Sequence, residues 1–154
     1  LGLVGSEMCK ETGAALARIL EVNTIGPALA FKHFAPLLAK DRRAVIAALS
    51  ARVGSISDNR TGGWYGYRAS KAALNMIVKS AAIEIARSRP QAVCVAVHPG
   101  TVDTPLSAPF QRGVQPGRLF APTRAAAQLV SVLGNLRPEQ SGRIFAWDGS
   151  EIAP

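Results

Sequence analysis

A tyrosine and a lysine stand four residues apart at the start of a long segment with helical periodicity. Tyr67 and Lys71 are therefore expected to leave one face of a helix, one turn apart. A free phenol has a pKa of about 10, but a nearby ammonium stabilises the phenolate and lowers that pKa. The pair could then give or take a proton near neutral pH. Such pairs are common on helix surfaces, so the spacing alone is a weak signal.

The elements that must hold this pair alternate between helices and strands. A long helix is expected over residues 11–40, with Thr12 as its cap. Pro27 should kink or split it, because proline lacks the N–H and crowds the previous turn. Short continuous apolar runs are typical of strands covered on both faces. The expected order is helix 11–40, strand 44–49, helix 64–88, strand 92–98, helix 123–136 capped by Thr123, and strand 142–147.

Strands that alternate with helices favour an α/β domain with a parallel sheet. Ligands of such sheets bind outside the carboxyl ends of the strands. Two loops leave the predicted strands at that edge, over residues 50–63 and 99–122. Because Tyr67 begins the helix that follows the first loop, we expect a site built from these loops and the start of that helix.

The composition is typical of a single soluble globular domain. The chain has 154 residues, of which 48% are hydrophobic and 18% are charged. No apolar run is expected to be long enough to cross a bilayer, and no signal segment is recognisable. The two cysteines make no disulfide framework, and Cys94 lies in an apolar run that predicts a core position. These features favour a reducing, cytoplasmic setting.

The charge balance is strongly basic, with a formal net charge of +8 and a pI of about 10.3. Such a balance can indicate an acidic partner such as nucleic acid. The arginines are scattered, however, and no helix carries a continuous basic stripe, so a solvated surface is favoured over nucleic-acid binding. His33 and His98 are expected to be structural. Neither aspartates nor histidines stand at metal-ligand spacing, so no metal site is predicted.

Three further motifs strengthen the Tyr67–Lys71 pair by their order along the chain. The four motifs are Val22-Asn23-Thr24-Ile25-Gly26, the serine-containing loop 50–55, Tyr67-Arg68-Ala69-Ser70-Lys71, and Pro99-Gly100-Thr101-Val102-Asp103-Thr104. In this order they resemble the second half of a short-chain dehydrogenase/reductase, over nearly the whole chain. The loop text around residues 53–56 and 62–67 is similar to the C-factor-like and carbonyl-reductase-like branch. The resemblance implies a Rossmann-like, doubly wound α/β fold.

The resemblance also implies a mechanism. Tyr67 would be the general acid that protonates a substrate carbonyl oxygen, and the general base in the reverse direction. Lys71 would lower the pKa of Tyr67 and hold the nicotinamide ribose. Asn23 would help to hold a water that links Lys71 to solvent through the kinked helix. The substrate would be a small carbonyl compound or alcohol.

The same resemblance implies a nicotinamide cofactor, NADP or NAD, with NADP slightly favoured by the branch. The stretch after the second strand would wall the nicotinamide, and Thr104 would reach the cofactor's amide or phosphates. The walling residues would be Pro99, Gly100, Thr101 and Val102. A homodimer or homotetramer is expected, because the first helix and the Tyr67 helix carry more apolar and small residues than one sheet face can cover.

The catalytic serine departs from the family pattern. The family places this serine three residues before a loop glycine, and counting back from Gly54 leads to Ala51. Ser50 and Ser55 flank the expected position. Neighbouring side chains of an extended segment point to opposite faces, so Ser50 replaces Ala51 only if the loop turns. Ser50 is the preferred candidate and Ser55 the rival.

The glycine-rich dinucleotide loop of the family has no counterpart here. Residues 1–154 are therefore predicted to form a single domain, the catalytic C-terminal portion of the fold without the N-terminal dinucleotide-binding βαβ units. This chain alone should bind the cofactor poorly. The alternative is a non-catalytic signalling or scaffold protein that keeps the fold, which the alanine in the serine position favours.

Overall fold

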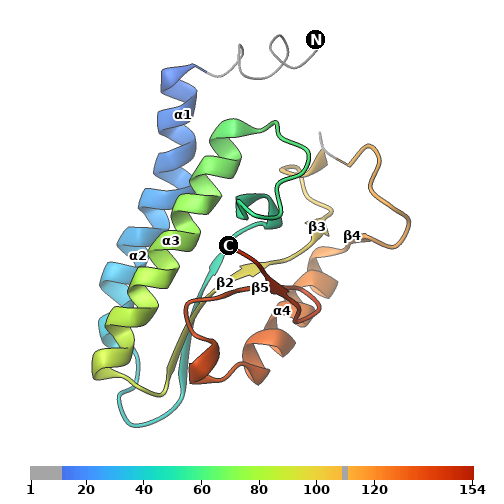
Figure 1. Cartoon of the computed structure of the whole chain (residues 1–154). Helices are drawn as coiled ribbons and strands as arrows, with labels where there is room; N and C mark the ends of the chain where they lie inside the picture. The colour runs from blue at the N-terminus through green and yellow to red at the C-terminus, as the bar shows by residue number, and fades with distance from the viewer. Residues whose placement is uncertain (1–11, 109–110) are drawn as a thin grey trace.

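The computed structural model describes residues 12–108 and 111–154, and a four-stranded sheet forms its centre (Figure 1). The strands are β1 (Ala44–Leu49), β2 (Ala92–His98), β5 (Ile144–Ala146) and β6 (Glu151–Ile152). They lie in the order β1-β2-β5-β6. The first three are parallel, and β6 is antiparallel to β5. The predicted bounds of the first two strands and the predicted parallel α/β sheet are confirmed.

Helices cover both faces of this sheet. Alternate residues of β2 point to opposite sides, so Cys94 packs with α3 (Tyr65–Ser88) whereas Val95 packs toward α4 (Pro122–Asn135). The first core also contains Leu74, Val78, Ala82 and Ile85 of α3 and Phe31 of the N-terminal helix. The second contains Leu136 and Phe145, with Leu129, Val132 and Leu133 of α4 packed against it. These three residues therefore form the inner side of α4.

The N-terminal helix is not continuous. It consists of α1 (Gly13–Leu20), a π-helical turn (Glu21–Ile25), α2 (Gly26–Phe34) and a 3₁₀ turn (Ala35–Leu37). Thr12 caps it as predicted, its hydroxyl accepting a hydrogen bond from the Ala15 amide at 3.2 Å. The break takes the form of a wide turn just before Pro27, a position where the missing N–H and bulky ring of proline are accommodated. The helix ends at Leu37 rather than at residue 40.

The same stretch corrects the prediction about membrane-crossing length. Gly13–Leu37 has 25 residues and contains an 18-residue window of mean hydropathy 1.2, of which only 11% is buried. By length and composition it is therefore long and apolar enough to cross a bilayer. Amphipathic core helices of globular proteins meet the same criterion, and one such helix is a weak signal. The prediction was wrong because it considered uninterrupted apolar runs, whereas this helical stretch reaches a high mean hydropathy with polar residues among the apolar ones.

Three further features differ from the predictions. The cap of α4 is Ala121, not Thr123, because Pro122 occupies the first helical position, where its missing N–H costs nothing. The predicted loop 99–122 contains a second small sheet, in which β3 (Thr101–Val102) pairs in parallel with β4 (Leu119–Phe120). The last predicted strand, 142–147, is shorter in the structure, where β5 covers Ile144–Ala146, and β6 follows it although no further strand was predicted.

Candidate active site

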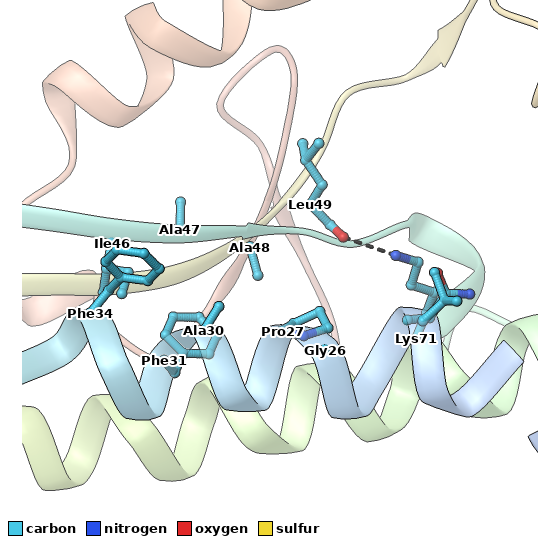
Figure 2. A pocket seen from close by; sticks show the side chains of 12 residues that line it. Gly26, Pro27, Ala30, Phe31, Phe34, Ile46, Ala47, Ala48, Leu49 and Lys71 are labelled. Carbon is cyan, nitrogen blue, oxygen red and sulfur yellow. Dashed lines mark hydrogen bonds between the residues drawn. The ribbon is translucent and has the colours of Figure 1, made fainter. Parts of the chain in front are cut away.

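Tyr67 and Lys71 lie in the first turns of α3, beside the carboxyl end of β1. Both side chains leave the same side of the helix, and the Lys71 Nζ lies 5.9 Å from the centre of the Tyr67 ring. Lys71 is only 8% exposed, and its Nζ donates a hydrogen bond to the Leu49 carbonyl at 2.9 Å. Figure 2 shows this bond between the helix and the last residue of β1. The geometry expected from the spacing is therefore present.

The electrostatics of the pair differ from the expectation. Burial raises the pKa of Tyr67 above its ordinary value, although the resemblance implied that Lys71 would lower it. Burial likewise lowers the pKa of Lys71. Removal from water disfavours the charged form of each side chain, the phenolate and the ammonium. Tyr67 is consequently a neutral phenol near neutral pH, which is the form that can donate a proton.

The π turn of the N-terminal helix meets α3 between these two residues. The Asn23 side-chain amide donates a hydrogen bond to the Ser70 hydroxyl at 3.2 Å, and the Thr24 hydroxyl donates to the Ser70 carbonyl at 2.9 Å. The Ser70 hydroxyl in turn donates to the Tyr67 carbonyl at 2.8 Å. A π turn is often found at functional sites. Here it turns two polar residues toward the helix that carries the tyrosine.

A cavity of about 550 Å³ lies between α2 and β1 and reaches Lys71 (Figure 2). Its walls are mostly apolar, and Asn23 and Lys71 are their polar members. The apolar lining comes from Val22, Gly26, Pro27, Ala30, Phe31, Phe34, Ile46, Ala47, Ala48 and Leu49. Asn23 and Lys71 line the same cavity, which agrees with the predicted role of Asn23 in holding a water near Lys71. That role stays a prediction.

The two candidate serines are both buried and already engaged. The Ser50 hydroxyl donates a hydrogen bond to Asn75 Oδ1 at 2.7 Å. The Ser55 hydroxyl accepts one from the Asp58 amide at 3.0 Å, which closes a local turn. Ala51 lies between them and is buried too. In the part of the chain that the structure describes, neither hydroxyl is hydrogen-bonded to Tyr67, so the choice between the two serines stays a prediction.

Asn75 was missed by the sequence analysis. Its side-chain oxygen accepts from Ser50, and its amide nitrogen lies 3.4 Å from the Gly54 carbonyl, to which it donates. It therefore ties two points in the first part of the loop after β1 to α3. A signal was available, because Asn75 stands four residues after Lys71 and so shares its helix face.

The stretch after β2 approaches the same edge of the sheet, because Val97 pairs with Leu49 in parallel register. Gly100 has φ +79°, and a Cβ added there would lie 2.6 Å from the Phe120 ring and 3.0 Å from Trp147. Only glycine fits this turn. Pro99 precedes the turn, and Thr101 and Val102 form β3. Thr104 follows, with its hydroxyl donating to the Val102 carbonyl at 3.4 Å.

Metal ligands do not gather within residues 12–108 and 111–154, where no group of three or more His, Cys, Asp or Glu side chains could hold an ion. His33 is exposed on α2. His98 ends β2, and its buried Nδ1 has no hydrogen-bond partner among the described residues. Burial, with a smaller contribution from Arg52, lowers the pKa of His98 to about 4, so this side chain is neutral at pH 7.

A mostly parallel sheet with helices on both faces is the Rossmann-like architecture, in which ligands bind outside the carboxyl ends of the strands, where Tyr67 and Lys71 lie. The sequence pattern of the short chain dehydrogenase family matches residues 3–115. The chain belongs to this family, and the resemblance noted from its motifs is confirmed. It resembles proteins named as dehydrogenases and carbonyl reductases.

Three similar proteins illustrate the relationship. The 1-hydroxy-2-glutathionyl-2-methyl-3-butene dehydrogenase of Rhodococcus sp. (strain AD45) is 37% identical over 88% of this chain and 57% of its own length. The C-signal protein of Myxococcus xanthus is 36% identical over 90% of this chain and 78% of its own. The NADPH-bound carbonyl reductase from chicken fatty liver has a TM-score of 0.83 at 28% identity, over 97% of this chain and 61% of that structure. The chain thus spans little more than half of two of these three proteins.

Proposed function

We propose that the protein transfers hydride between a nicotinamide cofactor and a small carbonyl compound or alcohol, with Tyr67 as the general acid and base. The observation that supports this most is the half-buried Tyr67 phenol beside the buried Lys71 ammonium, at the edge of the sheet where ligands bind. A neutral phenol in that place can donate its proton to a carbonyl oxygen that gains negative charge.

The residues at this edge fit a nicotinamide ribose. The Lys71 ammonium has three donors, and the Leu49 carbonyl is the acceptor recorded for it within the described residues. Its remaining N–H groups suit ribose hydroxyls. Pro99, Gly100, Thr101 and Val102 would wall the nicotinamide, and Thr104 would reach its amide or phosphates. The bound cofactor would supply the hydride.

The protein's own groups would then manage the proton. Tyr67 would donate it, and the Lys71 ammonium would stabilise the phenolate left behind. Asn23 would hold a water that returns a proton from solvent through the cavity it shares with Lys71. Ser50, with Ser55 as the rival, would donate a hydrogen bond to the substrate oxygen, which requires Ser50 to exchange its bond with Asn75.

The test replaces one hydroxyl at a time in the native full-length protein. Tyr67→Phe should lower kcat for carbonyl reduction by roughly a hundredfold to ten-thousandfold, because proton transfer from a placed acid contributes about that factor. Tyr65→Phe is the matched control, an exposed tyrosine two residues earlier, and should change kcat by less than about twofold. Unchanged kcat in Tyr67→Phe would refute the catalytic assignment.

The cofactor preference is proposed as NADP over NAD. The similarity to an NADPH-bound carbonyl reductase supports a nicotinamide cofactor without distinguishing the two. Because the chain covers 61% of that structure, we propose that residues 1–154 are the catalytic portion and that other residues choose the cofactor. The protein would be titrated with NADPH and with NADH while nicotinamide fluorescence is monitored. A lower Kd for NADPH than for NADH would support the proposed preference.

We also propose that the protein forms a homodimer or homotetramer. Large apolar side chains are exposed on both long helices, among them Phe34, Leu37, Met76 and Ile83. Exposed apolar surface of this kind commonly marks an interface. Sedimentation equilibrium should find a dimer or tetramer, and a stable monomer at high concentration would contradict this.

A non-catalytic signalling or scaffold role is the second candidate. Similarity to the C-signal protein and Ala51 in place of the family serine favour it. This role predicts that the full-length protein binds neither NADH nor NADPH, whereas the enzymatic role requires binding of at least one. The fluorescence titration therefore separates the two candidates before any substrate is known.

A further inference from the structure

Arg68 follows Tyr67 directly and makes more hydrogen bonds than the proposed chemistry accounts for. Its Nε donates to the carbonyls of Gly62 at 3.2 Å and Gly63 at 2.9 Å. Its Nη2 donates to the Gly62 carbonyl at 3.0 Å and to the Thr61 hydroxyl at 2.9 Å. Its Nη1 donates to the Val53 carbonyl at 3.2 Å. One guanidinium thus binds two separate parts of the loop between β1 and α3.

The segment that Arg68 binds has an uncommon backbone. Gly62, Gly63 and Trp64 have φ of 64°, 70° and 50°, so three successive residues are left-handed. Glycine adopts this conformation readily, but a tryptophan does so only where its surroundings impose it. The guanidinium carbon of Arg68 also lies 5.6 Å from the centre of a Trp64 ring. Arg68 therefore contacts the segment through both its backbone and its indole.

The location of this segment gives the contacts a consequence. Trp64 is the residue immediately before α3, and Tyr67 is in the first turn of that helix. Val53 belongs to the 3₁₀ turn Arg52–Gly54, which follows the carboxyl end of β1. Arg68 thus joins two stretches of the loop that precedes α3, next to the proposed general acid in sequence.

We propose that Arg68 is a positioning residue that fixes the left-handed segment 62–64 against the turn at Val53 and so shapes the substrate side of the Tyr67 site. The effect on catalysis rests on the proposed function. A lysine would not replace it, because an ammonium cannot present several donors in one plane to carbonyls that lie in different directions. Substrate affinity and selectivity then depend on Arg68, whereas proton transfer from Tyr67 does so only indirectly.

The experiment compares Arg68→Lys and Arg68→Met with Arg87→Met in the native full-length protein. Arg87 is an exposed arginine at the far end of the same helix and serves as the matched control. Hydrogen exchange of the amides of residues 59–64 should accelerate at least about tenfold in both Arg68 variants. KM for a carbonyl substrate should rise about tenfold while kcat changes less than about threefold, and the control should change neither.

Each outcome decides the matter. Unchanged exchange in Arg68→Met would overturn the inference whatever the activity. Faster exchange with unchanged KM would show that the segment does not shape the substrate site, which also overturns it. Loss of folding in both variants, measured by circular dichroism, would assign Arg68 a purely structural role. Full activity in Tyr67→Phe would instead remove the proposed function, and the exchange result would still show whether Arg68 fixes the segment.

Discussion

Strands β1 and β2 have similar sequences but very different surroundings. Each is a short continuous run of small and branched apolar residues, which predicts cover on both faces. Six of the seven residues of β2 are buried, whereas Ala48 is the buried residue of β1 and Leu49 is 61% exposed. The difference arises because β2 lies between two strands and β1 lies at the edge of the described sheet. An apolar run therefore predicts a strand, but it does not predict whether other elements bury both faces of that strand.

The loops that follow the two strands repeat this contrast. Three side chains of α3 form hydrogen bonds with the end of β1 and the loop after it. These side chains belong to Lys71, Asn75 and Arg68. The chain after β2 packs Gly100 against Phe120 and Trp147, whose rings are 4.7 Å apart. Polar groups of the candidate site therefore gather at the exposed strand, and close apolar packing gathers at the buried one.

The substitutions Gly54→Ala and Gly100→Ala, one in each loop, should have the largest effect on stability. They directly test the contrast between the polar loop after β1 and the apolar packing after β2. A Cβ at Gly54 would lie 2.7 Å from the Lys71 Cβ, and one at Gly100 would meet the Phe120 ring at positive φ. Each substitution should lower the free energy of unfolding by about 3 kcal/mol. Urea denaturation would measure this loss. Gly54→Ala should also raise KM for the cofactor in the folded fraction, and equal catalytic effects of both variants would break the contrast.

Truncation within the strands should show a smaller difference. Val95→Ala in β2 removes two methyl groups from a fully buried site and should cost about 2.5 kcal/mol. Val45→Ala in β1 starts from a half-buried site and should cost less than about 1 kcal/mol. Thermal or urea unfolding of the pair would measure both. A cost at Val45 as large as that at Val95 would indicate that β1 is covered in solution.

Acid should destabilise the end of β2 through His98. Its pKa is about 4 in the folded chain against 6.5 for a free imidazole, so between these values the unfolded chain binds more protons. Well above pH 6.5 the imidazole is neutral in both states and His98 does not affect stability, whereas its destabilising effect grows as the pH falls from 6.5 toward 4. Between pH 7 and pH 5 the expected loss is about 2 kcal/mol. His98→Gln should remove this part of the pH dependence of unfolding, and an unchanged profile would exclude His98 as its source.

Thiol labelling offers the mildest probe of the two strands. Burial raises the pKa of Cys94 in β2 to about 12, so its thiol should react with an aromatic disulfide at least about a hundredfold more slowly than a free thiol. A cysteine introduced by Ala47→Cys, on the exposed part of β1, should react at nearly the free rate. Cys9→Ser removes the other cysteine from both proteins. Comparable rates at the two strands would contradict the difference in burial.

The sequence predicted the elements whose signals are local. Strands β1 and β2 were located to the residue by their apolar runs. The predicted end of α3 at Ser88 is also confirmed, which fits the tendency of helices to end before a proline, here Pro90. The pairing of β3 with β4 was not predictable, because two residues have too little pattern and the partners are separated by the loop between them. The cap of α4 was misplaced because Thr123 fits a cap and Pro122 was not counted as the first helical residue.

The candidate site was predictable only where spacing along one helix defines it. Tyr67 and Lys71 share a face because of their four-residue separation. Their pKa directions depend on burial, which arises from the packing of other elements and has no local signal. The partner of Ser50 is a side chain 25 residues away, so its engagement with Asn75 was not predictable either. Arg68 gave no signal because most of its acceptors are backbone carbonyls, which any residue carries.

The π turn at Glu21–Ile25 makes the length of the N-terminal helix matter at one place. It holds one residue more than an α-helical turn, so deleting a single residue there would restore regular α-helical winding and leave the faces of α1 and α2 in nearly the same relation. Asn23 and Thr24 would then leave Ser70, although no side chain had been substituted. The effect of the deletion would therefore be confined to the contacts of Asn23 and Thr24, because the π turn accommodates the extra residue without rotating the rest of α1.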